Sequence, residues 1–211
     1  MYLIIFYIAL FSGFIPLIIL FYRQGATGSI KYPVAPFIWL TAIASLYELV
    51  ATVILKVNTT YWFQVYSLLE LTTVYFFFFK TSQERYRAIN KVLLLLLIAS
   101  YIASFYFWSN NGALLSNAIN HISITVFVII SLLLWVRNLF KETKVTNLWE
   151  YADFYFVAAI SIYYFSTVFL FLLSNFIFNS HLYFMSDYWL LNVIVTLILR
   201  VILSIGVWKM T

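Results

Sequence analysis

Long apolar segments recur along the chain, and short polar connections separate them. A helix that crosses a membrane needs about 20 mostly apolar residues. Segments that qualify lie at seven places: 2–22, 36–56, 61–79, 92–109, 115–136, 153–174 and 187–208. Their apolar residues are continuous and do not alternate with polar ones, which favours helices over the strands of a membrane barrel. The pattern therefore predicts an all-α, polytopic integral membrane protein, a single domain over 1–211 with seven transmembrane helices.

The composition indicates that lipid surrounds most of the protein surface. Of the 211 residues, 65% are hydrophobic and 9% are charged, whereas soluble domains are about half apolar and about a quarter charged. A compact soluble domain also needs a polar exterior, which this chain has too few polar residues to provide. The first segment is long enough to span and has no basic stretch before it, so we expect a retained helix rather than a cleaved signal peptide.

Basic residues mark one side of the predicted bundle. Lys and Arg follow the first, third, fifth and seventh segments at these positions: Arg23, Lys31, Lys80, Arg85, Arg87, Lys91, Arg137, Lys141, Lys144 and Lys209. The opposite side has Lys56, and the connections 110–114 and 175–186 contain neither residue type. Because basic residues concentrate in cytoplasmic connections, we expect the N-terminus outside and the C-terminus in the cytoplasm of a multi-pass protein of the cytoplasmic (inner) membrane.

Two surface features follow from this topology. The connector KTSQERYRAINK, residues 80–91, is basic and amphipathic, and we expect a partner membrane protein or a cytoplasmic output protein to bind it. Trp and Tyr cluster near the predicted interfaces, as at Trp62 and Trp189, which is typical of an aromatic belt. The net charge of +5 lies at the ends of apolar segments, so it indicates topology rather than nucleic-acid binding.

Three ionisable residues lie deep inside predicted helices: Glu48, Glu70 and Arg200. At about 1.5 Å per residue, Glu70 is roughly 14 Å from either end of its segment. An unpaired charge at that depth costs from about 3 to more than 10 kcal/mol. Each of these side chains is therefore expected to face the bundle interior and to find a partner or be neutralised.

These residues belong to polar stripes that recur at helical spacing, one on each of four predicted helices. The stripes contain Thr41, Ser45, Glu48 and Thr52; Gln64, Ser67, Glu70 and Thr73; Asn117, His121 and Thr125; and Asn192, Thr196, Arg200 and Ser204. Gln64, Asn117, His121 and Asn192 all fall in the outer half. We predict that the four stripes converge on a buried polar centre that extends toward the outer side.

Two interpretations of this centre remain open. In the structural one, Glu70 or Glu48 pairs with Arg200, and small polar residues hold the helices together. In the functional one, the centre binds a ligand, an ion or a proton, since intramembrane ionisable residues are often functional. Two acids against one arginine leave one carboxyl over, which favours the functional interpretation. His121 alone is more typical of a hydrogen-bonded helix residue than of a ligand.

The sequence lacks the residue patterns that metal binding, nucleophilic catalysis, phosphate binding and retinal binding require. There are 2 histidines and no cysteines, and neither His121 nor His181 has an acid at metal-ligand spacing, so we expect no metal site. Nucleophile-elbow and phosphate-binding glycine motifs are absent. A retinal Schiff base needs a lysine deep in a late helix, where Arg200 stands instead. We therefore expect a protein that is not an enzyme and that carries no cofactor.

Three stretches resemble a family of small, uncharacterised seven-helix membrane proteins of Bacteroidota. The first is LYELVATVIL followed by WFQVYSLLELTTVYFFFFK, the second is IYYFSTVFLFLLSNFIF, and the third is RVILSIGVWK. The resemblance spans most of the chain and implies a cytoplasmic-membrane location. It also implies that Tyr66 and Glu70, one helical turn apart, belong to a shared feature.

Taken together, these patterns predict a non-enzymatic membrane protein that senses a small ligand or ion, or serves as an accessory subunit of a membrane complex. Glu48, Glu70 and Arg200 would form its polar core. A small-solute or proton-coupled transporter is the alternative, with the surplus carboxyl carrying the proton. Carriers often break helices near the membrane centre. The candidates for such a break are Gly13 and Pro16 in the first helix and Gly206 near the end of the seventh, and nothing in the last three helices corresponds to Pro16, which favours the sensor.

Overall fold

The computed structural model describes residues 2–28, 31–57, 60–108, 113–142, 147–180 and 185–210, and this part of the chain is helical, without strands. The long helices are α1 (Tyr2–Ser12), α2 (Ile15–Gly28), α3 (Ala35–Tyr47), α4 (Thr60–Thr81), α5 (Arg87–Tyr106), α6 (Ala113–Glu142), α7 (Ala152–Ser180) and α8 (Met185–Lys209). A π-helical segment, η2 (Glu48–Ile54), continues α3, and 3₁₀ turns η3 (Glu84–Tyr86) and η4 (Leu148–Glu150) precede α5 and α7. The expectation of an all-α fold is confirmed for these residues.

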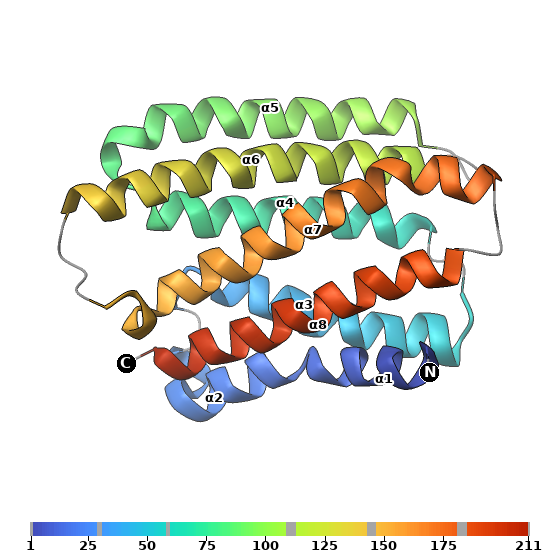
Figure 1. Ribbon diagram of the computed structural model, residues 1–211, viewed down its shortest axis with the longest axis horizontal. Helices are drawn as coiled ribbons and strands as arrows, with labels where there is room; N and C mark the ends of the chain where they lie inside the picture. The colour runs from blue at the N-terminus through green and yellow to red at the C-terminus, as the bar shows by residue number, and fades with distance from the viewer. Residues whose placement is uncertain are drawn as a thin grey trace.

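The helices run alongside one another in one bundle (Figure 1). Helix α7 crosses the bundle obliquely and packs against α6 and α8, and α8 packs in turn against α1 and α2. Helix α4 packs against α3, α5 and α6. Helices from the two ends of the sequence therefore form a single set of neighbours, which brings polar residues far apart in the chain within reach of one another.

Among the described residues, six helical segments are long and apolar enough to cross a membrane, and they correspond to every predicted span except 61–79. Helix α4, which contains that span, has 22 residues, but its polar side chains lower its mean hydropathy. It lies beside α5 and α6 in the bundle (Figure 1). Large apolar side chains such as Ile18, Leu95 and Phe169 are exposed on the outer surface. The protein thus has the long apolar helices of a multi-pass membrane protein, and a spanning role for α4 remains a prediction.

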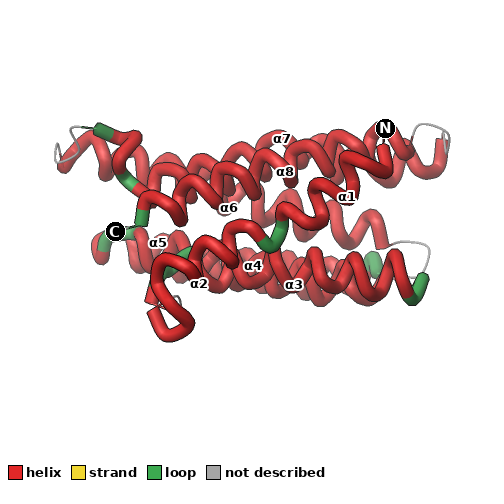
Figure 2. Tube along the Cα trace, turned by 90° about the horizontal axis from the view of Figure 1, so that it is seen from below, coloured by secondary structure: helices red, strands yellow, loops and turns green. Residues whose placement is uncertain are grey.

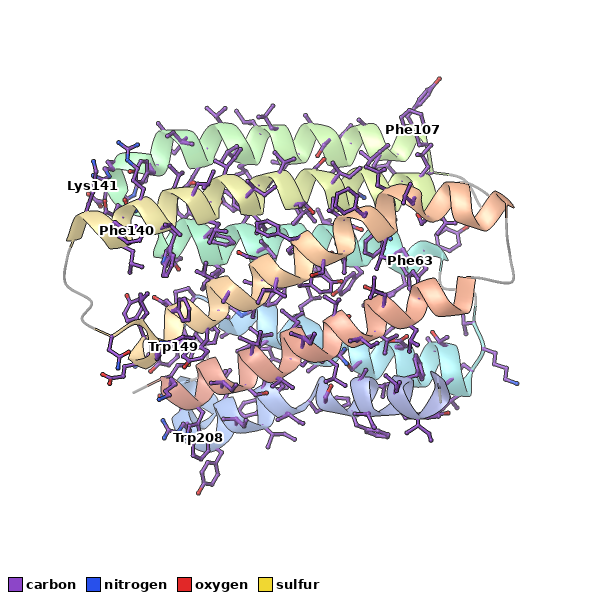
Figure 3. All side chains as sticks on the ribbon, viewed as in Figure 1. Phe63, Phe107, Phe140, Lys141, Trp149 and Trp208 are labelled. Atoms are coloured by element: carbon purple, nitrogen blue, oxygen red, sulfur yellow. The ribbon has the colours of Figure 1, made fainter. Side chains whose placement is uncertain are left out.

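Basic side chains gather at the end of the bundle where α4 and α8 end. Arg23 in α2 donates from Nη1 to the Met210 carbonyl at 2.9 Å and lies 4.7 Å from the centre of the Trp208 ring. Arg85 in η3 donates to Asn138 of α6. Figure 3 shows Lys141 and Trp208 at this end and Phe63 toward the other. The connections that carry most of the Lys and Arg therefore share one end, as the topology prediction requires.

The first predicted helix is broken, which corrects the expectation of one continuous helix over 2–22. Helix α1 ends at Ser12 and α2 begins at Ile15, and Figure 2 shows the short loop between them. The Gly13 amide donates to the Leu10 carbonyl at 3.3 Å instead of to the Ala9 carbonyl four residues back. Pro16 follows and has no N–H. The Ala9 carbonyl is thereby released from the helix and is available to side chains.

A second irregularity lies in the next segment. From Glu48 the chain winds as a π-helix, and the Leu55 amide donates to the Val50 carbonyl five residues back, at 2.9 Å. Long π-helical stretches are rare, and shorter ones occur frequently at functional sites. The apolar run 36–56 does not reveal this change, because its side chains are compatible with either winding.

The close-packed core occupies one half of the bundle. It contains Phe37 from α3, Phe77 from α4, Phe127 from α6, Phe156 from α7 and Leu203 from α8, all buried. Most of these residues lie toward the ends of α4 and α8 and the start of α7, which is the basic end. The cavity lies mainly in the other half, where α4, α6 and α8 begin, and it meets the core at Phe37, Tyr163 and Leu199, which belong to both.

Candidate functional site

A cavity of about 530 Å³ lies among α1, α3, η2, α4, α6, α7 and α8. Small-molecule sites in proteins typically measure about 300–1,000 Å³. All seven residues singled out from the sequence line it: Glu48, Tyr66, Glu70, Asn117, His121, Asn192 and Arg200. The structure thus brings every candidate to one place, and members of all four polar stripes meet there. That the cavity binds a ligand remains a prediction.

The cavity extends from one end of the bundle to its middle. Near that end it is lined by Trp62, Leu114 and Trp189, which lie close to the beginnings of α4, α6 and α8. These helices begin on the same side of the bundle (Figure 1). Glu70 and Arg200 line the deep part. Glu70 is ten residues into α4, about 15 Å along its axis. The polar centre therefore lies at mid-depth, and the cavity leads from it away from the basic end.

Arg200 is bound by neutral oxygen atoms. Its Nη1 donates to the Ala9 carbonyl that the break after α1 releases, and its Nη2 donates to Ser45 Oγ at 2.7 Å. Ser12 Oγ also donates to the Ala9 carbonyl, at 2.7 Å. No described residue forms an ion pair with Arg200. The ion pair of the structural interpretation, Glu70 or Glu48 with Arg200, is therefore not formed among the described residues, because the broken helix exposes a backbone acceptor that the guanidinium binds instead.

Gly13 makes this arrangement possible. A Cβ atom at this position would overlap Ser45 Oγ and would lie 2.9 Å from Ser45 Cβ and 3.0 Å from Arg200 Cζ. Any side chain larger than hydrogen would therefore push Ser45 and Arg200 away from the α1–α2 break. Because the packing at Gly13 is this tight, the break, the serine and the arginine form one unit.

The two acids differ in their surroundings. Glu48 stands at the start of η2, is half-buried and lies within electrostatic range of Arg200. Glu70 is only 5% exposed, and its nearest polar groups are tyrosine hydroxyls. Tyr164 interacts with it electrostatically, but the Tyr164 hydroxyl is buried without a hydrogen-bond partner among the described residues, and none of those residues forms an ion pair with Glu70. The carboxyl group left without a cationic partner is therefore that of Glu70.

Tyr66 interacts electrostatically with all three charged side chains of the cavity. It lies one turn from Glu70 on α4, and its hydroxyl is within electrostatic range of Glu70, Glu48 and Arg200. Tyr163 of α7 also lies near Glu70 and Arg200. The expected association of Tyr66 with Glu70 thus has a spatial basis, because both line the same cavity, one helical turn apart.

His121 is held as a structural side chain, although its ring lines the cavity. Its Nε2 is 2.8 Å from Thr167 Oγ1, and the Thr167 hydroxyl donates to the Tyr163 carbonyl at 2.7 Å. Since that hydroxyl has one proton, His121 Nε2–H is the donor of the pair. The imidazole lies 4.0 Å from the Phe171 ring centre. These contacts agree with a hydrogen-bonded helix histidine whose far edge contributes to the wall.

Gln64 belongs to a different polar cluster and does not line the cavity. Its Nε2 donates to Ser104 Oγ of α5 at 2.9 Å, and Ser116 Oγ of α6 donates to its Oε1 at 3.0 Å. Ser67 Oγ, one turn further along α4, shares its proton between the Phe63 carbonyl at 2.8 Å and Asn117 Oδ1 of α6 at 3.1 Å. The outer part of the α4 stripe therefore joins α4 to α5 and α6, as the structural interpretation of small polar residues expects.

Sequence reasoning missed the aromatic part of the wall. Trp62 and Trp189 were expected in the interfacial belt, yet both line the cavity. The Tyr47 and Trp62 rings stack at 3.9 Å, and Trp62 lies 6.0 Å from the Tyr66 ring. Phe171 is 6.4 Å from Trp189. An aromatic residue near a helix end fits a belt and a cavity equally well, so the sequence has no signal that separates the two.

The fold and the cavity define the class as an all-helical, multi-pass membrane protein with a polar internal cavity. Within the described residues, no group of three or more His, Asp or Glu side chains is placed to hold a metal ion; His181 lies outside them. No protein-family model matches the chain, and no curated protein or solved structure shows significant similarity to it. The resemblance to seven-helix proteins of Bacteroidota stays an expectation.

Proposed function

We propose that this is a non-enzymatic integral membrane protein that binds a small ligand or ion in the cavity, as a sensor or as the ligand-binding accessory subunit of a membrane complex. One observation carries the proposal. All seven candidate side chains, which come from η2, α4, α6 and α8, line one cavity of about 530 Å³ in a chain that is 65% hydrophobic. Burying an ionisable group inside a membrane protein costs free energy, so such groups are usually paired or functional. Glu70 has no cationic partner among the described residues, which favours a functional role.

In this proposal, seven spans, α4 included, cross the cytoplasmic (inner) membrane with the N-terminus outside. The gathering of basic connections at the far end of the bundle supports this orientation through the positive-inside tendency. The cavity then opens toward the outer side, and a ligand enters past Trp62 and Trp189.

A sensor needs an output, and the connector 80–91 is our proposed contact for a partner membrane protein or cytoplasmic output protein. Arg85 is bonded to Asn138, and Arg87 pairs with Glu84 at 2.8 Å on the surface. Lys80 and Lys91 are exposed. These exposed cations favour an acidic partner surface.

The absence of native cysteines allows a direct test. Single cysteines at Glu70, His121 and Asn192 are treated in intact cells with a small, membrane-impermeant thiol reagent. Cysteines at Lys56 and Lys91 report the outer and inner connections. We expect Lys56→Cys and Asn192→Cys to react from outside, and Lys91→Cys only after permeabilisation. Reaction of Lys91→Cys alone would reverse the orientation. Protection of all three cavity positions in folded protein would mean a sealed structural core.

A small-solute or proton-coupled transporter is the second candidate, and the helix irregularities favour it. The break at Gly13 and the π-helical segment from Glu48 both border the cavity, and discontinuous helices with exposed carbonyls are typical of transporter binding sites. Protein reconstituted in liposomes with a pH-sensitive dye inside distinguishes the two. Proton or solute flux above that of empty liposomes would replace the sensor with a carrier.

A further inference from the structure

The charges of the cavity do not balance. Glu48, Glu70 and Arg200 line it, so its formal charge is negative when all three are ionised. Arg200 acts electrostatically on Glu48, while its hydrogen bonds go to neutral oxygen atoms. Glu70 is 5% exposed and is surrounded by tyrosine hydroxyls. One positive charge placed beside Glu70 would bring the cavity to neutrality.

The wall that leads to Glu70 is aromatic. Tyr47 and Trp62 stack at 3.9 Å, and Tyr66 lies 6.0 Å from Trp62 on the same side. Trp189 and Phe171 form another part of the wall. Faces of Trp and Tyr rings attract cations, and proteins use such rings to recognise organic ammonium groups. A hard metal ion would instead require a shell of several oxygen ligands, which an aromatic wall does not supply.

Asn192 adds a hydrogen-bond acceptor. It lines the cavity through α8, and its Oδ1 packs against protein atoms without a hydrogen-bond partner among the described residues, so a rotation of the amide about χ2 would turn an unpaired acceptor toward the cavity. The Asn117 Oδ1 nearby already accepts from Ser67. A ligand with N–H donors suits this set of groups, whereas an anion would meet the surplus negative charge of the acids.

We propose that the cavity binds a monovalent organic cation, with its ammonium group beside Glu70 and an apolar or aromatic body between the rings of Trp62 and Trp189. This inference rests on the proposed function and names the chemical class of its ligand. The cavity volume of about 530 Å³ admits an amine with a substantial body rather than a bare ammonium ion. The negative charge of Glu48 then balances that of Arg200, and the negative charge of Glu70 balances that of the ligand.

The test compares three probes of equal shape and different charge: phenethylamine, phenethyl alcohol and phenylacetate. Purified full-length protein in a neutral detergent is titrated with each at neutral pH, where an alkylamine is protonated. Binding is followed by isothermal calorimetry and by the fluorescence of the tryptophans, two of which line the cavity. We expect the amine to bind about tenfold or more tighter than the alcohol, because a desolvated charge pair and cation–π contact favour it. Phenylacetate should bind least. Equal binding of amine and alcohol, or strongest binding of phenylacetate, would overturn the inference.

Two variants separate the cavity from general charge effects. Glu70→Gln keeps the shape and removes the charge, and we expect it to reduce amine affinity about tenfold while leaving alcohol binding unchanged. Glu84→Gln removes the same charge from the exposed turn η3, and we expect wild-type binding. An equal loss in both variants would contradict a site at Glu70. The probe series on the wild-type protein decides the matter if Glu70→Gln does not fold.

The cysteine test keeps this inference distinct from the proposed function. Reaction of Asn192→Cys from outside together with no preference for the amine would leave a ligand-binding cavity and refute the cation. Protection of the cavity cysteines together with no binding of any probe would refute both.

Discussion

Replacing Gly13 by alanine is expected to destabilise the protein strongly, although alanine is the better helix former. The added Cβ would overlap Ser45 Oγ and approach Arg200 Cζ to 3.0 Å. Overfilling a packed site costs about 1–3 kcal/mol. Displacing a guanidinium from its hydrogen bonds costs a further ~1.5–3 kcal/mol. Restricting the unfolded chain returns about 0.4–1 kcal/mol. The free energy of unfolding should therefore fall by about 1.5–5.5 kcal/mol.

The measurement is the free energy of unfolding in mixed micelles, followed by circular dichroism as sodium dodecyl sulfate is increased. Gly25→Ala is the matched control. Gly25 has φ 66° and ψ 172°, a conformation almost restricted to glycine, and a Cβ there would have nothing within 4 Å, so its cost of about 1–3 kcal/mol arises from backbone conformation alone. A second variant, Gly13→Ala with Ser45→Gly, removes both serine atoms that the new Cβ meets.

A double-mutant cycle decides whether the reasoning holds. Since the clash is with Ser45, the double variant should be more stable than the sum of the Gly13→Ala and Ser45→Gly effects implies, by about 1 kcal/mol or more in the free energy of unfolding. Gly13→Ala with wild-type stability would refute the close approach. Additive effects of the two substitutions would refute the contact between Gly13 and Ser45.

Two further predictions concern helix packing. A Cβ at Gly206 would lie 2.5 Å from Phe156 Cε1, so Gly206→Ala should lower the free energy of unfolding by about 1–3 kcal/mol. Adding Phe156→Leu should recover part of that loss. An unchanged melting temperature of Gly206→Ala would contradict the contact between α7 and α8. Gln64→Leu leaves the fully buried Ser116 hydroxyl without its acceptor, while Ser104 keeps its hydrogen bond to the Tyr101 carbonyl. The free energy of unfolding should therefore fall by about 1–2 kcal/mol in the same assay, whereas an equally stable variant would show that α4 is held by apolar contacts alone.

Much of the candidate site was predictable because of what a charge in a membrane requires. Glu70 and Arg200 sit in long apolar segments, so they have to face inward. The stripe positions Asn117 and Asn192 follow from helical spacing. These arguments need one helix at a time. The cavity contains all seven candidates for this reason, even though the predicted helices are up to six residues shorter at an end than the observed ones.

Partner choice inside the bundle was not predictable. In the structural interpretation, opposite charges favoured a Glu–Arg200 pair. The break after α1 instead provides a neutral acceptor, the Ala9 carbonyl, which an argument from charges alone does not consider. Gln64 shares the α4 stripe with Glu70 yet bonds to α5 and α6. Which neighbour a side chain meets depends on how helices are rotated and packed against one another. Helical spacing determines the face of a residue, and it says nothing of what lies opposite.

The sequence by itself determined that the chain is helical and lipid-facing, because long apolar segments have few other stable forms in a membrane. It also determined which polar side chains turn inward. Only the tertiary structure decided that α1 is broken at Gly13, that Arg200 binds the released Ala9 carbonyl, and that Glu70 lacks a cation. Those outcomes depend on which polar groups come within hydrogen-bond distance when helices distant in sequence pack together. The distances between helices depend on packing across the whole bundle, and the sequence of one segment does not determine them.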